Sequence, residues 1–155
     1  MMQSTQTDLI TNSSLFDEKT FYGAFTSDLL RANQEVIIES PYITKERMKY
    51  FHPILSRLLE NGVKIYIFTR NPKEHDLVMA IQAEPEIQNF ELLGIQTFIC
   101  TGNHHRKLAI IDRKILWEGS LNILSQNYSR EIMRRIEEEK VTLEMFEFLK
   151  FQRFI

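Results

Sequence analysis

The apolar and polar positions of this chain follow two patterns, one with helical spacing and one with short continuous apolar runs. Helical spacing covers residues 14–33, and a short apolar run at residues 35–39 predicts a buried strand. Thr44 is placed to cap a second helix, which Asn61 and Gly62 bring to an end. The chain therefore begins with a helix, a strand and a second helix.

The rest of the chain continues the alternation. Strands are predicted at residues 63–69, 95–100, 107–111 and 115–118. A helix is predicted at residues 75–93 with a break at Pro85, because proline lacks the N–H group that a helix interior needs. Asp112, Arg113 and Lys114 form a tight turn between the last two strands, which predicts a hairpin.

This order of elements predicts an α/β fold of one domain, with a mixed sheet, right-handed crossovers and helices on both faces. A chain of 155 residues that is 43% apolar and 26% charged is of ordinary size and composition for such a domain. Residues 1–13 are polar and lack a sustained period, so we expect a flexible arm there, followed by the folded domain at residues 14–155.

The C-terminal segment, residues 138–155, is helical by its spacing but carries more apolar positions than one helix face can bury. One interpretation is a core helix that is buried on several sides. The other is that part of the segment contacts a second subunit.

Net charge, cysteine content and hydropathy indicate which partners and which cellular location are expected. The formal net charge is -2, so a polyanionic partner would need a local basic patch. The single cysteine, Cys100, excludes an intrachain disulfide, and residues 1–10 lack the pattern of a secretion signal. No run approaches the roughly 20 apolar residues that span a bilayer. We therefore expect a soluble, cytoplasmic protein without stable membrane anchoring.

The chemistry is concentrated in residues 104–112 and in the following Gly119-Ser120-Leu121-Asn122. If Lys107 lies on a strand, His105 and Lys107 leave the same face of the sheet, and Arg106 points away. Gly119 permits a sharp bend, and Ser120 stands where a helix would begin.

These side chains match the needs of phosphoryl transfer. The imidazole of His105 can act as nucleophile or proton donor, Lys107 as a positive charge, and Ser120 and Asn122 as neutral donors to phosphate. No carboxylate cluster that would hold magnesium is evident in the sequence. A lone histidine or a Gly-Ser pair is usually structural, so the joint spacing carries the inference.

The pattern His105-x-Lys107, Asp112 and then Gly119-Ser120-x-Asn122 resembles the HxKxxxxD and GSxN signature of the phospholipase D superfamily. The resemblance covers residues 20–150 and implies a phospholipase D-like mixed sheet between helices. It implies that His105 attacks phosphorus to give a covalent phosphohistidine, that Lys107 and Asn122 hold the phosphate oxygens, and that Ser120 helps line the site. It implies no metal and no other cofactor.

Two acidic residues accompany the pattern. Asp112 has the opposite strand parity from His105, so we interpret it as a structural residue that supports the loop around the site. Glu131 resembles the acidic residue that small bacterial nucleases of the family use to hydrogen-bond the catalytic histidine; the alternative is a solvated charge.

The family mechanism uses two histidines, and this chain has one motif. His52, His75 and His104 lack the lysine and aspartate that would mark a second copy. A homodimer that pairs two His105 side chains across a twofold axis is the resulting prediction.

Basic residues flank the motif, and we interpret them as a rim that binds substrate phosphates, with solvated surface charge as the alternative. They are Arg106, Arg113, Lys114, Arg130, Arg134 and Arg135. A zinc site at Cys100, His104 and His105 is disfavoured, because a structural site usually needs four ligands at recognisable spacing.

These features predict a metal-independent phosphodiesterase, first of all a nuclease that cleaves DNA or RNA as a homodimer. The chain also resembles the phospholipase D-like domain of helicase-like proteins, which implies a helicase or ATPase as partner or parent chain. Two alternatives stay open. One is a phospholipid hydrolase or phosphatidyl transferase, and the other is a catalytically silent module that binds nucleic acid.

Overall fold

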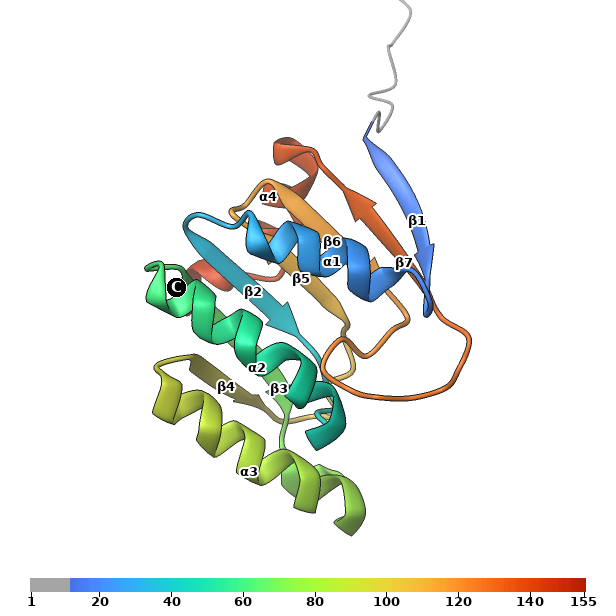
Figure 1. The fold of residues 1–155 in the computed structure, drawn as a ribbon, viewed down its shortest axis with the longest axis vertical. Coiled ribbons are helices and arrows are strands. Elements are labelled where there is room, and N and C mark those ends of the chain that lie inside the picture. Colours follow the sequence, from blue (N-terminus) through green and yellow to red (C-terminus); the bar gives the residue numbers. More distant parts are fainter. Residues whose placement is uncertain (1–11) are drawn as a thin grey trace, which may run out of the picture.

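A seven-stranded sheet runs through the molecule with helices on both faces (Figure 1). It is seen in a computed structural model that describes residues 12–155. The strands are β1 (Ser13–Asp17), β2 (Glu35–Glu39), β3 (Lys64–Arg70), β4 (Gln96–Cys100), β5 (Leu108–Ile111), β6 (Ile115–Gly119) and β7 (Ile132–Ile136). The helices are α1 (Phe21–Leu30), α2 (Lys45–Glu60), α3 (Leu77–Leu93) and α4 (Glu139–Phe148), with 3-10 turns η1 (Pro72–Glu74) and η2 (Phe151–Arg153).

The strands lie in the order β1-β7-β6-β5-β2-β3-β4. β2, β3 and β4 are parallel and are joined through α2 and α3, whereas β5 is antiparallel to β2 and begins an antiparallel run through β6, β7 and β1. The predicted mixed sheet and the β5–β6 hairpin are thus confirmed.

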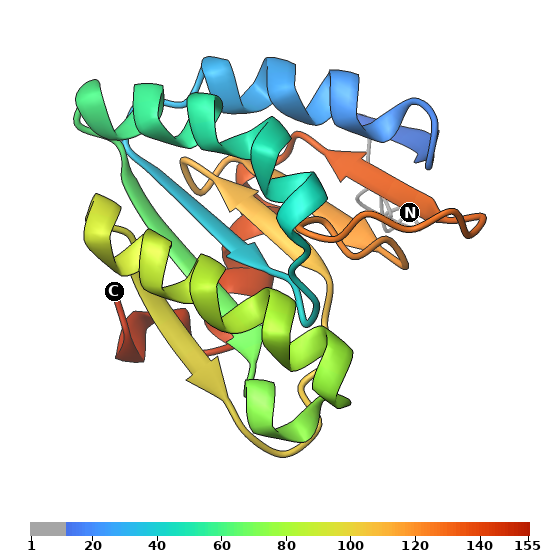
Figure 2. The same ribbon diagram turned by 60° about the horizontal axis from the view of Figure 1, so that its bottom comes forward.

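Each face of the sheet has its own apolar core. Helices α1, α2 and α3 cover one face (Figure 2), where Phe25, Phe51 and Trp117 are completely buried. On the other face, Phe146 of α4 and Phe151 of η2 pack with residues of the central strands. All five residues of β2 are buried, which explains the apolar run Val36-Ile37-Ile38 at its centre.

Local signals set several boundaries where we expected them. The Thr44 side chain accepts a hydrogen bond from the Arg47 N–H and caps α2. Gly94 ends α3 in the left-handed conformation at φ 92°, which glycine adopts without strain.

The first predicted helix begins too early. Residues Ser13–Asp17 form strand β1, and the Asp17 carboxylate then accepts the N–H groups of Lys19 and Thr20 in a turn before α1 starts at Phe21. The boundary of the predicted N-terminal arm is also wrong, because Ser13 belongs to β1. The rest of that arm, residues 1–11, lies outside the described residues.

Two more predictions about helices are wrong. Pro85 does not break α3, which continues from Leu77 to Leu93 with Pro85 on its exposed side. The C-terminal helix α4 is shorter than predicted: it ends at Phe148, and Lys150, with φ 58°, turns the chain into η2.

Candidate active site

One edge of the sheet gathers the residues of the predicted site. The carboxyl ends of β2, β3 and β4 lie at this edge, together with the start of β5 and the end of β6, because β5 and β6 form a hairpin. His105 and Lys107 precede β5, and Gly119 and Ser120 close β6. The antiparallel pairing therefore brings the two halves of the sequence pattern together.

His105 and Lys107 are in direct contact. The Lys107 Nζ lies 2.9 Å from the His105 Nδ1, 3.4 Å from its Nε2 and 2.8 Å from its carbonyl oxygen. Both residues come just before β5, which starts at Leu108 rather than at Lys107. Their side chains nevertheless converge, as their spacing predicts.

The pKa values of both side chains are lowered at this position. The positive charge of Lys107 lowers the pKa of the exposed His105, and partial burial and Arg70 add to the effect. Burial lowers the pKa of Lys107, and the charge of Glu131 opposes that change. The lowered pKa favours the neutral imidazole of His105 at pH 7, and its unprotonated nitrogen can accept the hydrogen bond from Lys107.

Arg106 points the other way and anchors the segment. Its guanidinium donates to both carboxylate oxygens of Glu39, at 3.0 and 2.8 Å, and Glu39 is completely buried at the end of β2. Burial raises the pKa of Glu39, and the Arg106 hydrogen bonds oppose this rise. Arg106 is nevertheless half exposed and lies in the wall of the groove that leads to His105, so a contact with substrate stays a prediction.

His104 lies beside the same carboxylate. Its Nε2 is 3.8 Å from Glu39 Oε1, and its side chain is 7% exposed. Burial lowers the pKa of His104 to about 4, with smaller effects from Arg106, His105 and Lys107. His104 is neutral at pH 7 and is a poor proton donor there.

Gly119 and Ser120 are set by strand β7. A Cβ atom at Gly119 would collide with the Ile132 carbonyl oxygen and lie 2.9 Å from Met133 Cα, so no larger residue fits without moving β7. The Ser120 N–H donates to Ile132 O at 2.9 Å, and its Oγ accepts the Ile132 N–H at 3.0 Å. Ser120 begins a loop, and the helix predicted there is not formed.

Asn122 lies in the same loop. Its backbone oxygen accepts a hydrogen bond from the Tyr22 hydroxyl, which also donates to Ile123 O and Ser125 O. The side-chain oxygen of Asn122 is buried and has no hydrogen-bond partner among the described residues. A buried amide with an unused acceptor is typical of a site that a ligand or water completes.

Glu131 contacts other residues than predicted. Its carboxylate accepts the Ser129 hydroxyl at 2.6 Å, and its charge acts on Lys107. Within residues 12–155, no hydrogen bond joins Glu131 to His105. Glu131 therefore acts on the lysine of the site, and the expected carboxylate–imidazole pair is absent.

Tyr42 and Arg70 also lie beside His105, although the sequence pattern does not predict them as site residues. The Tyr42 ring stacks on His75 at 5.0 Å between centroids and meets His105 edge to face at 6.2 Å. Arg70 donates to Glu74 O and Asn103 Oδ1, and its charge lowers the pKa of His105. Tyr42 follows β2, and Arg70 is the last residue of β3. Sites often form at the carboxyl ends of parallel strands, and this position is the sequence signal that could have identified both residues.

Asp112 lies at the other end of β5 from His105. Its carboxylate accepts the N–H groups of Asn33, Gln34 and Glu35 at 2.8 to 3.0 Å. Asp112 thus supports the segment that joins α1 to β2. The prediction that it supports the loop around the site is wrong, because that segment lies at the opposite end of β5.

The predicted basic rim is divided. Arg113 donates to the Glu35 carboxylate at 2.7 Å, and Lys114 shares its turn, so both lie far along the hairpin from His105. Arg135 binds Asp28 and Glu137. Arg106 and Arg134 line the groove that leads to His105, and Arg130 is exposed in the β6–β7 loop.

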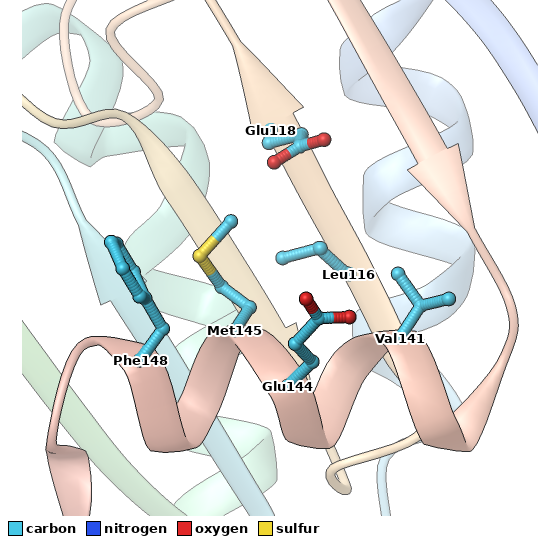
Figure 3. A pocket seen from close by; sticks show the side chains of 6 residues that line it. All are labelled: Leu116, Glu118, Val141, Glu144, Met145 and Phe148. Carbon is cyan, nitrogen blue, oxygen red and sulfur yellow. The ribbon is translucent and has the colours of Figure 1, made fainter.

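An open groove of 690 Å³ leads to His105, Lys107 and Ser120. Its apolar lining consists of Leu15, Leu108, Ile132, Met145, Phe148 and Leu149. A smaller pocket adjoins it between β6 and α4, where Val141, Glu144, Met145 and Phe148 face Leu116 and Glu118 (Figure 3). The reactive groups thus lie at one end of an apolar depression.

Residues 12–155 contain no group of three or more histidine, cysteine, aspartate or glutamate side chains arranged to hold a metal ion. Among the helices in that range, none is both long and apolar enough to cross a membrane.

Comparison with known proteins decides the family. A family model described as "Cardiolipin synthase, PLD-like domain" matches residues 25–150. The chain belongs to the phospholipase D superfamily. No curated protein sequence matches this phospholipase D-like chain at a significant level.

Several solved structures share the fold. NucT from Helicobacter pylori superposes with a TM-score of 0.65 at 19% identity, covering 89% of this chain and 92% of that one. Nuc from Salmonella typhimurium, a phospholipase D family member, gives a TM-score of 0.67 at 16% identity with the same coverage. TrmBL2, an archaeal chromatin protein, gives 0.63 at 13% identity, covering 98% of this chain and 55% of that one.

Proposed function

We propose that this chain is a metal-independent nuclease that cleaves DNA or RNA through a covalent phosphohistidine at His105. The observation that carries the proposal is the contact of the Lys107 ammonium with a neutral, exposed imidazole at the head of an open groove. A histidine nucleophile needs an unprotonated ring nitrogen, and a phosphate needs a positive charge beside it. This pair supplies both.

The proposed reaction has two steps. The unprotonated nitrogen of His105 attacks phosphorus, the N–P bond forms, and the P–O bond to one nucleoside breaks as that oxygen receives a proton from an acid. Water then attacks the phosphohistidine, loses its proton to the same group, and releases His105. Lys107, Arg70 and the Asn122 amide stabilise the additional negative charge on the phosphate oxygens.

The acid must come from elsewhere, and the histidines of this chain supply it poorly. His104 has a pKa of about 4, and burial and Arg70 lower the pKa of His75. His105 itself is exposed, so the negative charge of a bound phosphate raises its pKa and lets a second copy donate the proton. We therefore propose a homodimer with two His105 side chains in one site.

The surface beside His105 supports this dimer. Leu15, Ile132 and Phe148 line the groove and are 63%, 63% and 78% exposed. Exposed apolar side chains gathered around a reactive site are typical of a contact surface. The second interpretation of the C-terminal segment, contact with another subunit, fits Phe148 of α4.

Nucleic acid is the favoured substrate. The similar TrmBL2 is a chromatin protein with a described mode of DNA binding, and Nuc and NucT share the fold over most of both chains. The proposal includes a cytoplasmic location and a helicase or ATPase as partner or parent chain.

Phospholipid hydrolysis or phosphatidyl transfer is the second candidate. The apolar lining of the groove next to His105 would accommodate acyl chains, and the matching family model describes a cardiolipin synthase domain.

One assay separates the candidates. Purified protein is given fluorescent single- and double-stranded DNA and RNA, and in parallel a short-chain phosphatidylcholine, all with excess EDTA. We expect cleavage of nucleic acid that chelator leaves unchanged. Turnover of the lipid alone, or nucleic-acid cleavage that is lost in EDTA and restored by magnesium, would contradict the proposal.

A further inference from the structure

A second hollow lies on the opposite face of the sheet from the apolar groove. It measures 320 Å³ and lies between α1, α2 and the β6–β7 loop, which is the orange loop after β6 in Figure 1. Its lining includes Lys19, Tyr22, Arg47 and Tyr128. None of these residues takes part in the chemistry proposed for His105.

Arg47 is an arginine without a carboxylate partner among residues 12–155. Its guanidinium lies 3.6 Å from the centroid of the Tyr22 ring, and its Nε is buried without a hydrogen-bond partner. By contrast, Arg106, Arg113 and Arg135 all bind carboxylates. The donors of Arg47 are therefore available to an anion that enters the hollow.

One carboxylate also lines this hollow. The Glu18 carboxylate accepts the Glu131 N–H at 3.4 Å and keeps its negative charge. The exposed ammonium of Lys19 adds a second positive charge to that of Arg47. The charged side chains of the lining are thus two cations and one anion, which leaves the hollow with a net positive charge.

Tyr128 supplies a flat surface at the same place. It is 93% exposed, which is the highest exposure among the large apolar side chains of the described residues. An aromatic ring held open to solvent beside cationic side chains is the arrangement that stacks on nucleic-acid bases.

The hollow is joined directly to the catalytic loop. The Tyr22 hydroxyl, in its wall, donates to the backbone oxygens of Asn122 and Ile123. A strand that crosses the edge of the sheet at His105 would therefore pass from the groove to this hollow along the Ser120–Asn122 segment.

We propose that this hollow binds a flanking nucleotide of a single-stranded substrate. Arg47 and Lys19 bind its phosphate, and Tyr128 stacks on its base. The inference rests on the proposed nuclease function and identifies the form of nucleic acid that the site takes.

Binding is measured without turnover, by fluorescence anisotropy of a labelled dT12 oligonucleotide with the His105→Ala protein. Tyr128→Ala in that background should raise Kd about tenfold, and Tyr128→Phe should keep it within about twofold, because stacking requires the ring and not the hydroxyl. Arg47→Gln should reduce the slope of log K against log salt by about 0.7, the value for one phosphate contact on a single strand. Arg47→Lys should keep that slope.

Matched controls lie elsewhere on the surface. Leu92→Ala removes another highly exposed apolar side chain, on α3, and Arg57→Gln removes an exposed charge near the end of α2. Both should leave Kd and the salt slope unchanged. Thermal melting of each variant confirms that it is folded.

Three outcomes overturn the inference: an unchanged Kd for Tyr128→Ala, an unchanged salt slope for Arg47→Gln, or no binding of dT12 by the His105→Ala protein. The nuclease proposal fails separately, if the wild-type chain binds dT12 but cleaves no nucleic acid.

Discussion

At the turn end of the β5–β6 hairpin, Asp112 accepts three backbone N–H groups and Arg113 binds Glu35. At the open end, the Lys107 ammonium contacts the imidazole and carbonyl of His105, and a groove lies in front of both residues. The same short motif thus serves two purposes. Charges that are satisfied inside the protein hold the fold, and charges left facing a groove are available to a substrate.

The largest expected effect comes from the open end. His105→Ala should lower phosphodiesterase activity by about 10⁴-fold, because the nucleophile is lost, and the melting temperature should change little since His105 is exposed. Activity is measured with a labelled oligonucleotide, and the covalent intermediate by acid-quenched transfer of ³²P to the protein. Near-normal turnover by the pure variant would show that another residue attacks phosphorus.

Substitution at the turn end should lower the stability of the protein and leave its activity almost unchanged. Asp112→Ala leaves three backbone N–H groups without their acceptor, so we expect a loss of about 2–4 kcal/mol in the free energy of unfolding and activity close to wild type at 25 °C. Urea denaturation measures this loss. Lys114→Ala, in the same turn, is the matched control and should change stability by less than about 0.5 kcal/mol. Equal stability of both variants would contradict the structural role of Asp112.

A smaller expected effect tests whether the two subunits of a dimer share one active site with both His105 side chains. If only dimers with two intact His105 residues work, complete exchange of equal amounts of wild-type and His105→Ala chains leaves roughly a quarter of the activity. Independent sites would leave roughly half. Native mass spectrometry of differently tagged chains verifies exchange, and sedimentation verifies the dimer. An active monomer would turn attention to His75 as an in-chain acid.

The smallest expected effect is a change in the pKa of His105. Lys107 is the main cause of the lowered pKa of His105, so removing its charge in Lys107→Met should raise that pKa toward the ordinary value near 6.5. The wild-type imidazole stays neutral down to a lower pH than the variant. NMR titration of the His105 ring protons measures both values, with Arg57→Gln as control. A pKa that does not rise would show that the contact with Lys107 is not maintained in solution.

The sequence predicts the hairpin and the pair of His105 and Lys107 because both depend on neighbours along the chain. Central strands such as β2 are also predictable, since complete burial leaves a continuous apolar run. Strands β1 and β7 are harder to predict: β7 includes two arginines, and both strands acquire their conformation from pairing with distant residues.

Sequence also fails to predict those residues of the site that strand pairing brings together. Tyr42 and Arg70 reach His105 only because parallel pairing aligns the ends of β2 and β3. Asp112 belongs to the same sequence motif as His105, yet four strand residues separate it from the site, so proximity in sequence misplaced its role. Distance along an extended strand, at about 3.3 Å per residue, explains that error.

The ion pair between Glu39 and Arg106 has a consequence for how this chain can diverge from its relatives. Glu39 is completely buried, whereas half of the Arg106 side chain is exposed, so the two residues are not equivalent. Replacing Arg106 alone would leave the Glu39 carboxylate without its partner in the interior, at a cost of about 3–5 kcal/mol, whereas replacing Glu39 alone would leave a guanidinium that water reaches. A substitution at position 106 should therefore be tolerated best after Glu39 has been replaced, so positions 39 and 106 should covary across relatives of this chain.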